Sequence, residues 1–198
     1  MQIYLCGMDE SDVYRVTDPR ALKAVAHPLR GRLLGALRVE GPATATELAA
    51  RFGESSGSTS YHLRQLARYG FVEEDPEQRD ARERRWRSVH RYTAWNEAEL
   101  EVTAEGREAA FDMRDRQVLV LVRARELFER ERVVLGPEWL EAAGMSDDFA
   151  MLTPASVIAL RERVLALLHE LEARDADAPG RERVSLHMAL FPSRTYPE

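Results

Sequence analysis

"SSGSTSYHLRQLARYGFV", residues Ser55–Val72, is the stretch that decides the fold. Thr59, Leu63 and Leu66 recur at helical spacing, which predicts a helix with one buried face that begins after the first serine. Gly70 stands where helices commonly end in the left-handed conformation. The first half of the helix is rich in small hydroxyl residues, which are mediocre helix formers. Their presence at the start of the helix therefore indicates a role in hydrogen bonding, because a hydroxyl can both donate and accept hydrogen bonds.

The residues before this stretch predict three more helices. Asp18 is a typical N-cap, and the proline after it suits the first helical position. Pro28 interrupts this helix, and a second helix continues until Gly41. Thr44 and Glu47 have the spacing of a capping box, which predicts a short third helix. A tight turn then separates the third helix from the serine-rich one.

After residue 70 the hydrophobic period changes from that of helices to that of strands. "FVEED" (71–75) and "RERRWRSVHRYTAW" (82–95) indicate two strands, joined by the polar turn "PEQRDA". Arg85 and Arg87 share one face of the second strand, whereas Trp86 and Trp95 are expected to pack against the helices. A short helix, a turn, a second helix and a basic hairpin are the parts of a winged helix-turn-helix.

Three segments carry a resemblance to a known family: "LKAVAHPLRGRLLGAL" (22–37), "TATELAARFGESSGSTSYHLRQLARYGFVEE" (44–74) and "RRWRSV" (84–89). They resemble the DNA-binding domain of ArsR/SmtB-type winged-helix transcriptional regulators. The resemblance implies a homodimer, more often a repressor, that binds an inverted-repeat operator in double-stranded DNA. Metal-sensing members carry paired cysteines at the segment that corresponds to "TATELAARF". This chain has none there, so no metal and no other cofactor is expected.

The serine-rich end of the helix is predicted to enter the major groove of DNA, where small hydroxyls allow close approach. Tyr61 and Arg64 are the longest side chains on the outer face, so they are the best candidates for base contacts. The hairpin arginines are expected to contact phosphates. The predicted DNA-contacting residues are Ser56, Gly57, Ser58, Ser60, Tyr61, Arg64, Arg68, Arg82, Arg84, Arg85 and Arg87. The alternatives are an ordinary capped helix and a solvated strand whose arginines pair with the chain's own carboxylates.

The charge of the chain is unevenly distributed. The 198 residues have a net charge of −6, yet residues 20–91 hold 14 basic and 9 acidic side chains and the remainder has a net charge of −11. Local charge matters most to an anionic partner, because screening limits interactions to about 8 Å in physiological salt. Two alternatives stay open: a winged-helix adaptor that binds a protein instead of DNA, and, ranked lower, an RNA-binding protein.

The second half of the chain predicts long helices and one strand. Thr103 can cap a helix that extends to about Arg132, and residues 157–171 repeat apolar side chains at intervals of three and four. "VSLHMALF" (184–191) alternates as a half-buried strand does, and that strand could wall an effector pocket. The helix at 157–171 could pack against the helix that follows Thr103 in the same chain or form the dimer interface, and the helix that follows Thr103 is the preferred dimer element.

These patterns predict an α+β, mainly α, protein. A winged helix-turn-helix DNA-binding domain would span residues 1–95, and a helical dimerisation and possible effector region with a small C-terminal β element would span 96–198. Cys6 is the only cysteine, which excludes a disulfide within one chain. No signal peptide, membrane-spanning run or catalytic motif is recognisable. We therefore expect a cytoplasmic protein that is not an enzyme.

Overall fold

The computed structural model describes residues 10–77, 84–192 and no others. These residues form two compact units, one of which ends at Leu119 while the other begins at Val120. The fold is α+β and mainly helical, with a winged helix-turn-helix in the first unit, as the sequence predicts. Among the predicted site residues, Arg82 lies outside the described residues.

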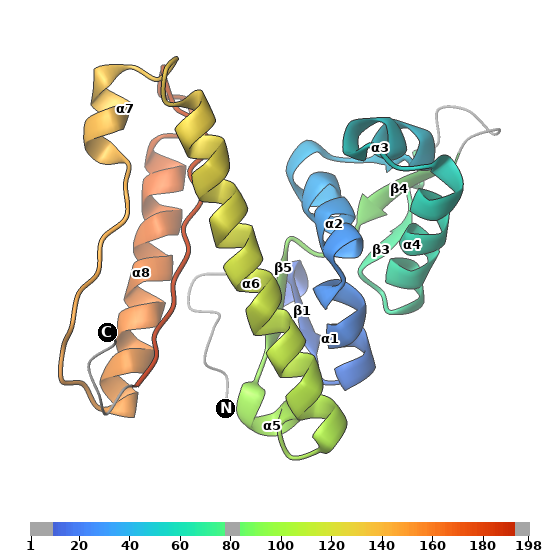
Figure 1. The fold of residues 1–198 in the computed structure, drawn as a ribbon, viewed down its shortest axis with the longest axis horizontal. Coiled ribbons are helices and arrows are strands. Elements are labelled where there is room, and N and C mark those ends of the chain that lie inside the picture. The colour runs from blue at the N-terminus through green and yellow to red at the C-terminus, as the bar shows by residue number, and fades with distance from the viewer. Residues whose placement is uncertain (1–9, 78–83, 193–198) are drawn as a thin grey trace. The chain divides into compact units, whose positions relative to one another are not determined.

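The first unit contains most of the regular structure (Figure 1). Its elements are the 3₁₀ helix η1 (Glu10–Asp12), β1 (Val13–Val16), α1 (Pro19–Ala26), α2 (Pro28–Glu40), β2 (Ala43–Thr44), α3 (Ala45–Phe52), α4 (Ser56–Arg68), β3 (Val72–Glu74), β4 (Arg85–Ser88), β5 (Tyr92–Trp95), α5 (Glu97–Leu100) and the first part of α6 (Ala104–Glu131). The strands β2, β4 and β3 form one sheet in that order, and β1 pairs with β5 in a second sheet.

Local capping signals fix where the helices of this unit begin and end. The Asp18 carboxylate accepts the backbone N–H of Arg20 at 2.9 Å. Thr44 and Glu47 form the predicted capping box, with the Thr44 hydroxyl accepting the Glu47 N–H at 3.1 Å and the Glu47 carboxylate accepting the Thr44 N–H at 2.7 Å. Gly53 ends α3 in the left-handed conformation, with a φ of 69°. The helix starts predicted from Asp18 and Thr44 are confirmed.

The segment 82–95 is not one strand, which corrects the sequence prediction. It contains two strands, β4 and β5, which belong to different sheets. Between them the Ser88 hydroxyl donates to the carbonyl of His90 at 2.7 Å. The same carbonyl accepts the Arg38 side chain of α2 at 3.0 Å. These bonds hold the chain in a bend, and β5 is thereby free to pair in parallel with β1, Val13 lying opposite Tyr92.

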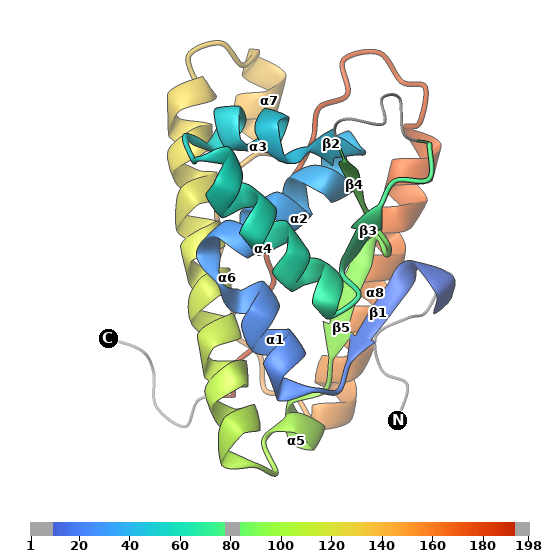
Figure 2. The same cartoon turned by 90° about the vertical axis from the view of Figure 1, so that its right-hand side faces the viewer.

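The core of the first unit lies between α1, α2, α4 and the hairpin. Leu22, Leu33, Leu63 and Leu66 are completely shielded from solvent and belong to one apolar cluster. Figure 2 shows α1, α2 and α4, which contribute to this cluster, with β3 and β4 beside α4. Trp86 is buried, which confirms its predicted packing role, and Trp95 packs against the same cluster.

The second unit consists of the rest of α6, α7 (Pro137–Ala142) and α8 (Pro154–Arg174). Thr153 caps α8 by accepting the N–H of Ser156 at 3.2 Å, as its position before a proline predicts. The predicted C-terminal strand is wrong: within the described residues, 181–192 contain no strand, and Val184 is 64% exposed. Alternating hydrophobicity predicts a two-faced segment, but a strand also needs a neighbour for its backbone hydrogen bonds.

Apolar side chains of the second unit are poorly covered. Between residues 114 and 192, which the structure describes throughout, no side chain is buried. The repeat on α8 is included, since Leu160 and Leu167 are 40% and 53% exposed. None of the described helices combines the length and apolarity needed to cross a membrane. A single chain therefore leaves a large part of the apolar surface of this unit in contact with water.

Candidate nucleic-acid interface

The helix α4 has two faces with different environments. Thr59, Leu63 and Leu66 are buried, as the sequence predicts. The Ser55 hydroxyl accepts the N–H of Ser58 at 3.1 Å, which satisfies one of the free amides at the start of the helix. On the outer face five predicted site residues are exposed and two are partly exposed. The exposed ones are Ser56, Gly57, Tyr61, Arg64 and Arg68, and the partly exposed ones are Ser58 and Ser60.

The first turns of α4 are accordingly open to a large ligand. Tyr61 is 54% exposed although it is a large ring. Arg64 makes no hydrogen bond or ion pair with any residue that the structure describes, and the Arg68 guanidinium lies 5.8 Å from the centre of the Tyr69 ring. Because Arg64 and Arg68 are four residues apart, they lie on the same side of the helix. The face therefore presents hydroxyls, a phenol and two cations together.

Thr59 carries a polar group into the core. Its side chain is fully buried, and its hydroxyl oxygen has no hydrogen-bond partner among the described residues. The helical spacing predicts the burial of Thr59 but gives no sign of the unsatisfied hydroxyl. A buried hydroxyl without a partner costs about 1–3 kcal/mol relative to a bonded one.

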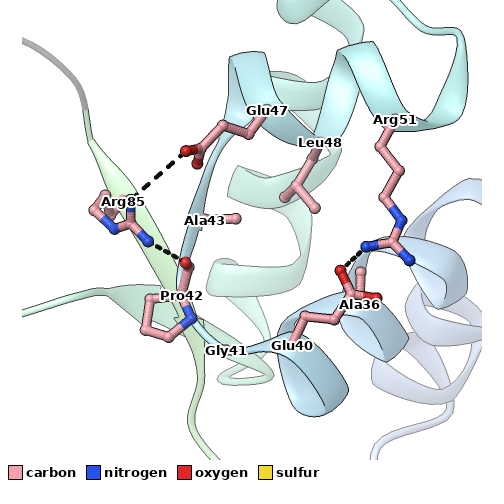
Figure 3. A pocket seen from close by; sticks show the side chains of 9 residues that line it. All are labelled: Ala36, Glu40, Gly41, Pro42, Ala43, Glu47, Leu48, Arg51 and Arg85. Carbon is pink, nitrogen blue, oxygen red and sulfur yellow. Dashed lines mark hydrogen bonds and ion pairs between the residues drawn. The ribbon is translucent and has the colours of Figure 1, made fainter.

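The hairpin arginine Arg85 turns back onto its own domain. Its guanidinium donates to the carbonyl of Pro42 and lies 3.7 Å from the Glu47 carboxylate. Figure 3 shows these contacts at a cavity of about 470 Å³, where Arg51 pairs with Glu40 in the same way. The Arg85 side chain is only 20% exposed. Its contacts join β4 to Pro42 and to Glu47 in the first turn of α3.

The other two described hairpin arginines also pair with carboxylates. Glu73 lies directly opposite Arg87 in the sheet, and its carboxylate accepts the Arg87 Nε–H at 2.9 Å and an Nη2–H at 2.6 Å. Arg84 lies 2.9 Å from the Glu74 carboxylate. All four side chains are more than 40% exposed, and such surface pairs contribute only about 0–1 kcal/mol. A phosphate could therefore compete for Arg84 and Arg87.

Sequence reasoning missed the carboxylates that face these arginines. Glu73 and Glu74 lie on β3, and their positions opposite β4 depend on the register of the two strands. The turn between the strands does not fix that register from residue types alone. The alternating charges on the two strands were the available signal, because opposite charges favour directly facing positions.

A pair of histidines joins α4 to the start of α2. The rings of His27 and His62 lie 4.7 Å apart, centre to centre, and the ring of Tyr61 meets that of His62 edge-on at 5.2 Å. Burial lowers the pKa of both imidazoles, and the neighbouring Arg30 guanidinium lowers it further. The Nδ1 atoms of both rings are buried without a hydrogen-bond partner among the described residues. His62 is therefore partly buried against His27, although it belongs to the candidate DNA-binding helix.

Comparison with known proteins agrees with this geometry. No curated protein matches the chain significantly. A family model does match residues 25–75, which contain α2, α3, α4 and β3. This model describes a helix-turn-helix domain, a domain type associated with DNA binding and the regulation of transcription. The part of the chain that carries the exposed face of α4 is therefore a helix-turn-helix domain.

Proposed function

We propose that the chain is a sequence-specific transcriptional regulator of the ArsR/SmtB type that binds double-stranded DNA and does not sense metals. The observation that carries the proposal is the uncovered face of α4, with Tyr61 and Arg64 exposed, inside the matched helix-turn-helix domain. A helix in this position fits a major groove about 12 Å wide. The amides and hydroxyls at its start suit phosphate and base edges.

Each predicted residue then has a distinct role. Tyr61 and Arg64 contact bases, and Arg68 contacts the adjacent backbone. The small residues Ser56, Gly57, Ser58 and Ser60 allow the helix to approach closely. Arg84 and Arg87 exchange their carboxylates for phosphates, and Arg82 is assigned the same role from the sequence alone. Arg85 holds the hairpin in place through Glu47 and Pro42.

We further propose that the regulator is a cytoplasmic homodimer that represses transcription. The exposed apolar side chains of the second unit support a dimer, because large uncovered apolar surfaces mark interfaces. On the part of α6 in this unit they are Val120, Val122 and Leu127, and the exposed Val118 and Leu119 precede them at the end of the first unit. We therefore assign DNA binding to residues 1–95 and dimerisation to residues 96–198, with α6 as the preferred dimer element. Two-fold symmetry would match an inverted-repeat operator.

One observation favours a second candidate, a winged-helix adaptor that binds a protein instead of DNA. The pairing of the hairpin arginines with Glu47, Glu73 and Glu74 weakens the positive field of the wing. An adaptor would have little affinity for duplex DNA even in dilute salt. A DNA-binding protein would lose affinity with a log–log slope of about −0.9 for each phosphate it contacts.

The test is selection of bound duplexes from a random DNA pool with the full-length protein. Enrichment of an inverted repeat with half-site centres ~10 base pairs apart, or a multiple of that, supports a dimeric DNA-binding regulator. Enrichment of a single half-site supports sequence-specific binding without the dimer. If no duplex is enriched and none binds in dilute salt, the protein is an adaptor and the proposal fails.

A further inference from the structure

The junction between α1 and α2 is a single residue, His27, because α1 ends at Ala26 and α2 begins at Pro28. The proline keeps the residue before it out of the helical region, and the ψ of His27 is accordingly 128°. The His27 side chain makes no capping bond to α2. It packs instead against α4, where the centre of its ring lies 4.7 Å from that of His62. This short junction therefore seats one imidazole against another.

Each ring of this pair buries one of its nitrogens. The Nδ1 atoms of His27 and His62 are shielded from solvent and have no hydrogen-bond partner among the described residues. A neutral imidazole tolerates this arrangement, because one of its two nitrogens carries no hydrogen. In the protonated form both nitrogens carry a hydrogen, so the buried Nδ1 would become a donor without an acceptor. The contact therefore suits two neutral rings.

A cation is held close to the two rings. The Arg30 side chain of α2 donates to the carbonyl of Ala24 and, at 3.3 Å, to that of Lys23, both near the end of α1. Burial lowers the pKa of His27 and of His62, and the Arg30 guanidinium lowers both further. A proton on either ring would be repelled by Arg30, and a second proton would also be repelled by the first.

One carboxylate acts on the pair in the opposite direction. Glu54, between α3 and α4, favours the charged form of His62, but burial and Arg30 have larger effects. The charged groups that influence the pKa values of the pair are therefore Arg30 and Glu54, together with the two rings themselves. Their sum favours the neutral state, in which the two rings can stay in contact.

The pair also touches a residue that the proposed function assigns to base contact. The Tyr61 ring meets the His62 ring edge-on, with centres 5.2 Å apart. Tyr61 is 54% exposed, so this contact is one of the restraints on where its hydroxyl lies. His62 rests in turn on His27 at the α1–α2 junction. A displacement of His62 would therefore be transmitted to the outer face of α4.

We propose that the contact between His27 and His62 is sensitive to protons, and that its protonation weakens the binding of duplex DNA. The inference rests on the proposed function, because it concerns the regulation of the same helix. Two neutral rings hold α4 and Tyr61 in the arrangement that fits the groove. When an imidazole takes up a proton from solvent, the unpaired Nδ1–H and the repulsion from Arg30 separate the rings. The population of the DNA-binding arrangement then falls, and the apparent affinity falls with it.

The direction of the effect separates this proposal from simple charge attraction. Additional positive charge on a DNA-binding helix would by itself strengthen binding in acid, because the duplex is anionic. The proposal predicts the opposite. The pKa values of both histidines lie below the usual 6.5, so the affinity should be constant above that pH and fall below it. The fall should approach about tenfold per pH unit for each proton that the DNA-binding arrangement excludes.

The test is the affinity of the full-length protein for the selected duplex between about pH 5 and about pH 8 at constant salt. The unmodified protein should lose affinity in acid, and the double variant His27→Gln/His62→Gln should not. His187→Gln is the matched control, because it removes an exposed histidine and should lose affinity in acid as the unmodified protein does. Circular dichroism of the same samples shows whether the protein stays folded.

A second measurement needs no DNA. Imidazole signals in the NMR spectrum of the free protein report the pKa of His27, which should rise towards 6.5 in His62→Gln because burial and the neighbouring ring are both removed. An unchanged pKa of His27 would overturn the proposal. So would an affinity that is unchanged or higher in acid, or a loss of affinity that coincides with global unfolding. If no duplex binds even at neutral pH, the proposed function fails as well, whereas binding at neutral pH without a loss in acid refutes this inference alone.

Discussion

Replacing Glu73 by glutamine should strengthen DNA binding, although the residue would contact no DNA itself. In the free protein the Glu73 carboxylate accepts hydrogen bonds from Nε and Nη2 of Arg87, at 2.9 and 2.6 Å. A phosphate must displace this carboxylate or bind beside it. Glu73→Gln removes both the competition and a negative charge, so Arg87 becomes available to the duplex.

The exposure of the pair sets the size of the effect. The side chains of Arg87 and Glu73 are 44% and 45% exposed, and pairs of this kind contribute about 0–1 kcal/mol. The affinity of Glu73→Gln for the selected duplex should therefore rise by up to about fivefold. If Arg87 gains one phosphate, the log–log dependence of affinity on salt should become steeper by about 0.9.

Fluorescence anisotropy with the selected duplex, measured at several salt concentrations, tests this prediction. Glu105→Gln is the control, because it changes the net charge equally at an exposed position in the first turn of α6. In an Arg87→Gln background the Glu73 change should have a smaller effect. If Glu73→Gln and Glu105→Gln have the same affinity and salt slope, Arg87 does not contact phosphate and the proposed role of the hairpin is wrong.

Three further outcomes are expected. Arg64→Ala should reduce the preference for the selected duplex over a random one by about 1–3 kcal/mol. Competition binding measures this loss. An unchanged preference would mean that a different face of the protein contacts the bases. Leu63→Ala should lower the free energy of unfolding by about 2–5 kcal/mol in urea, because its side chain is fully buried. Stability should also fall as the pH drops below 6.5, the ordinary pKa of histidine. The pKa values of His27 and His62 are lower than this in the folded domain, so the unfolded chain binds protons first and is favoured. Replacing both histidines by glutamine should flatten the dependence of the free energy of unfolding on pH, measured by urea denaturation. If that dependence is unchanged, it arises from other titratable groups.

Features that depend on neighbouring residues could be predicted from the sequence. The caps at Asp18, Thr44 and Ser55 use side chains within three residues of their targets, so their spacing alone indicates them. The buried face of α4 follows in the same way from helical periodicity, and the exposed site residues on its other face follow from it.

Features that join distant parts of the chain could not be predicted. The pairing of β1 with β5 and the contact of His27 with His62 depend on how the elements pack. The Glu73–Arg87 pair depends on strand register in addition to residue type. The alternation in residues 184–191 is misleading for a related reason, because the segment has an apolar side but no strand beside it.

The unpartnered hydroxyl of Thr59 has a consequence for how this protein can change over evolutionary time. Valine has nearly the same shape, so Thr59→Val would remove the polar group from the core and raise the melting temperature. The side chains that would touch an operator project from the opposite side of the same helix. If α4 contacts an operator as proposed, thermal tolerance and operator choice could drift separately in descendants of this protein, although one thirteen-residue helix would influence both.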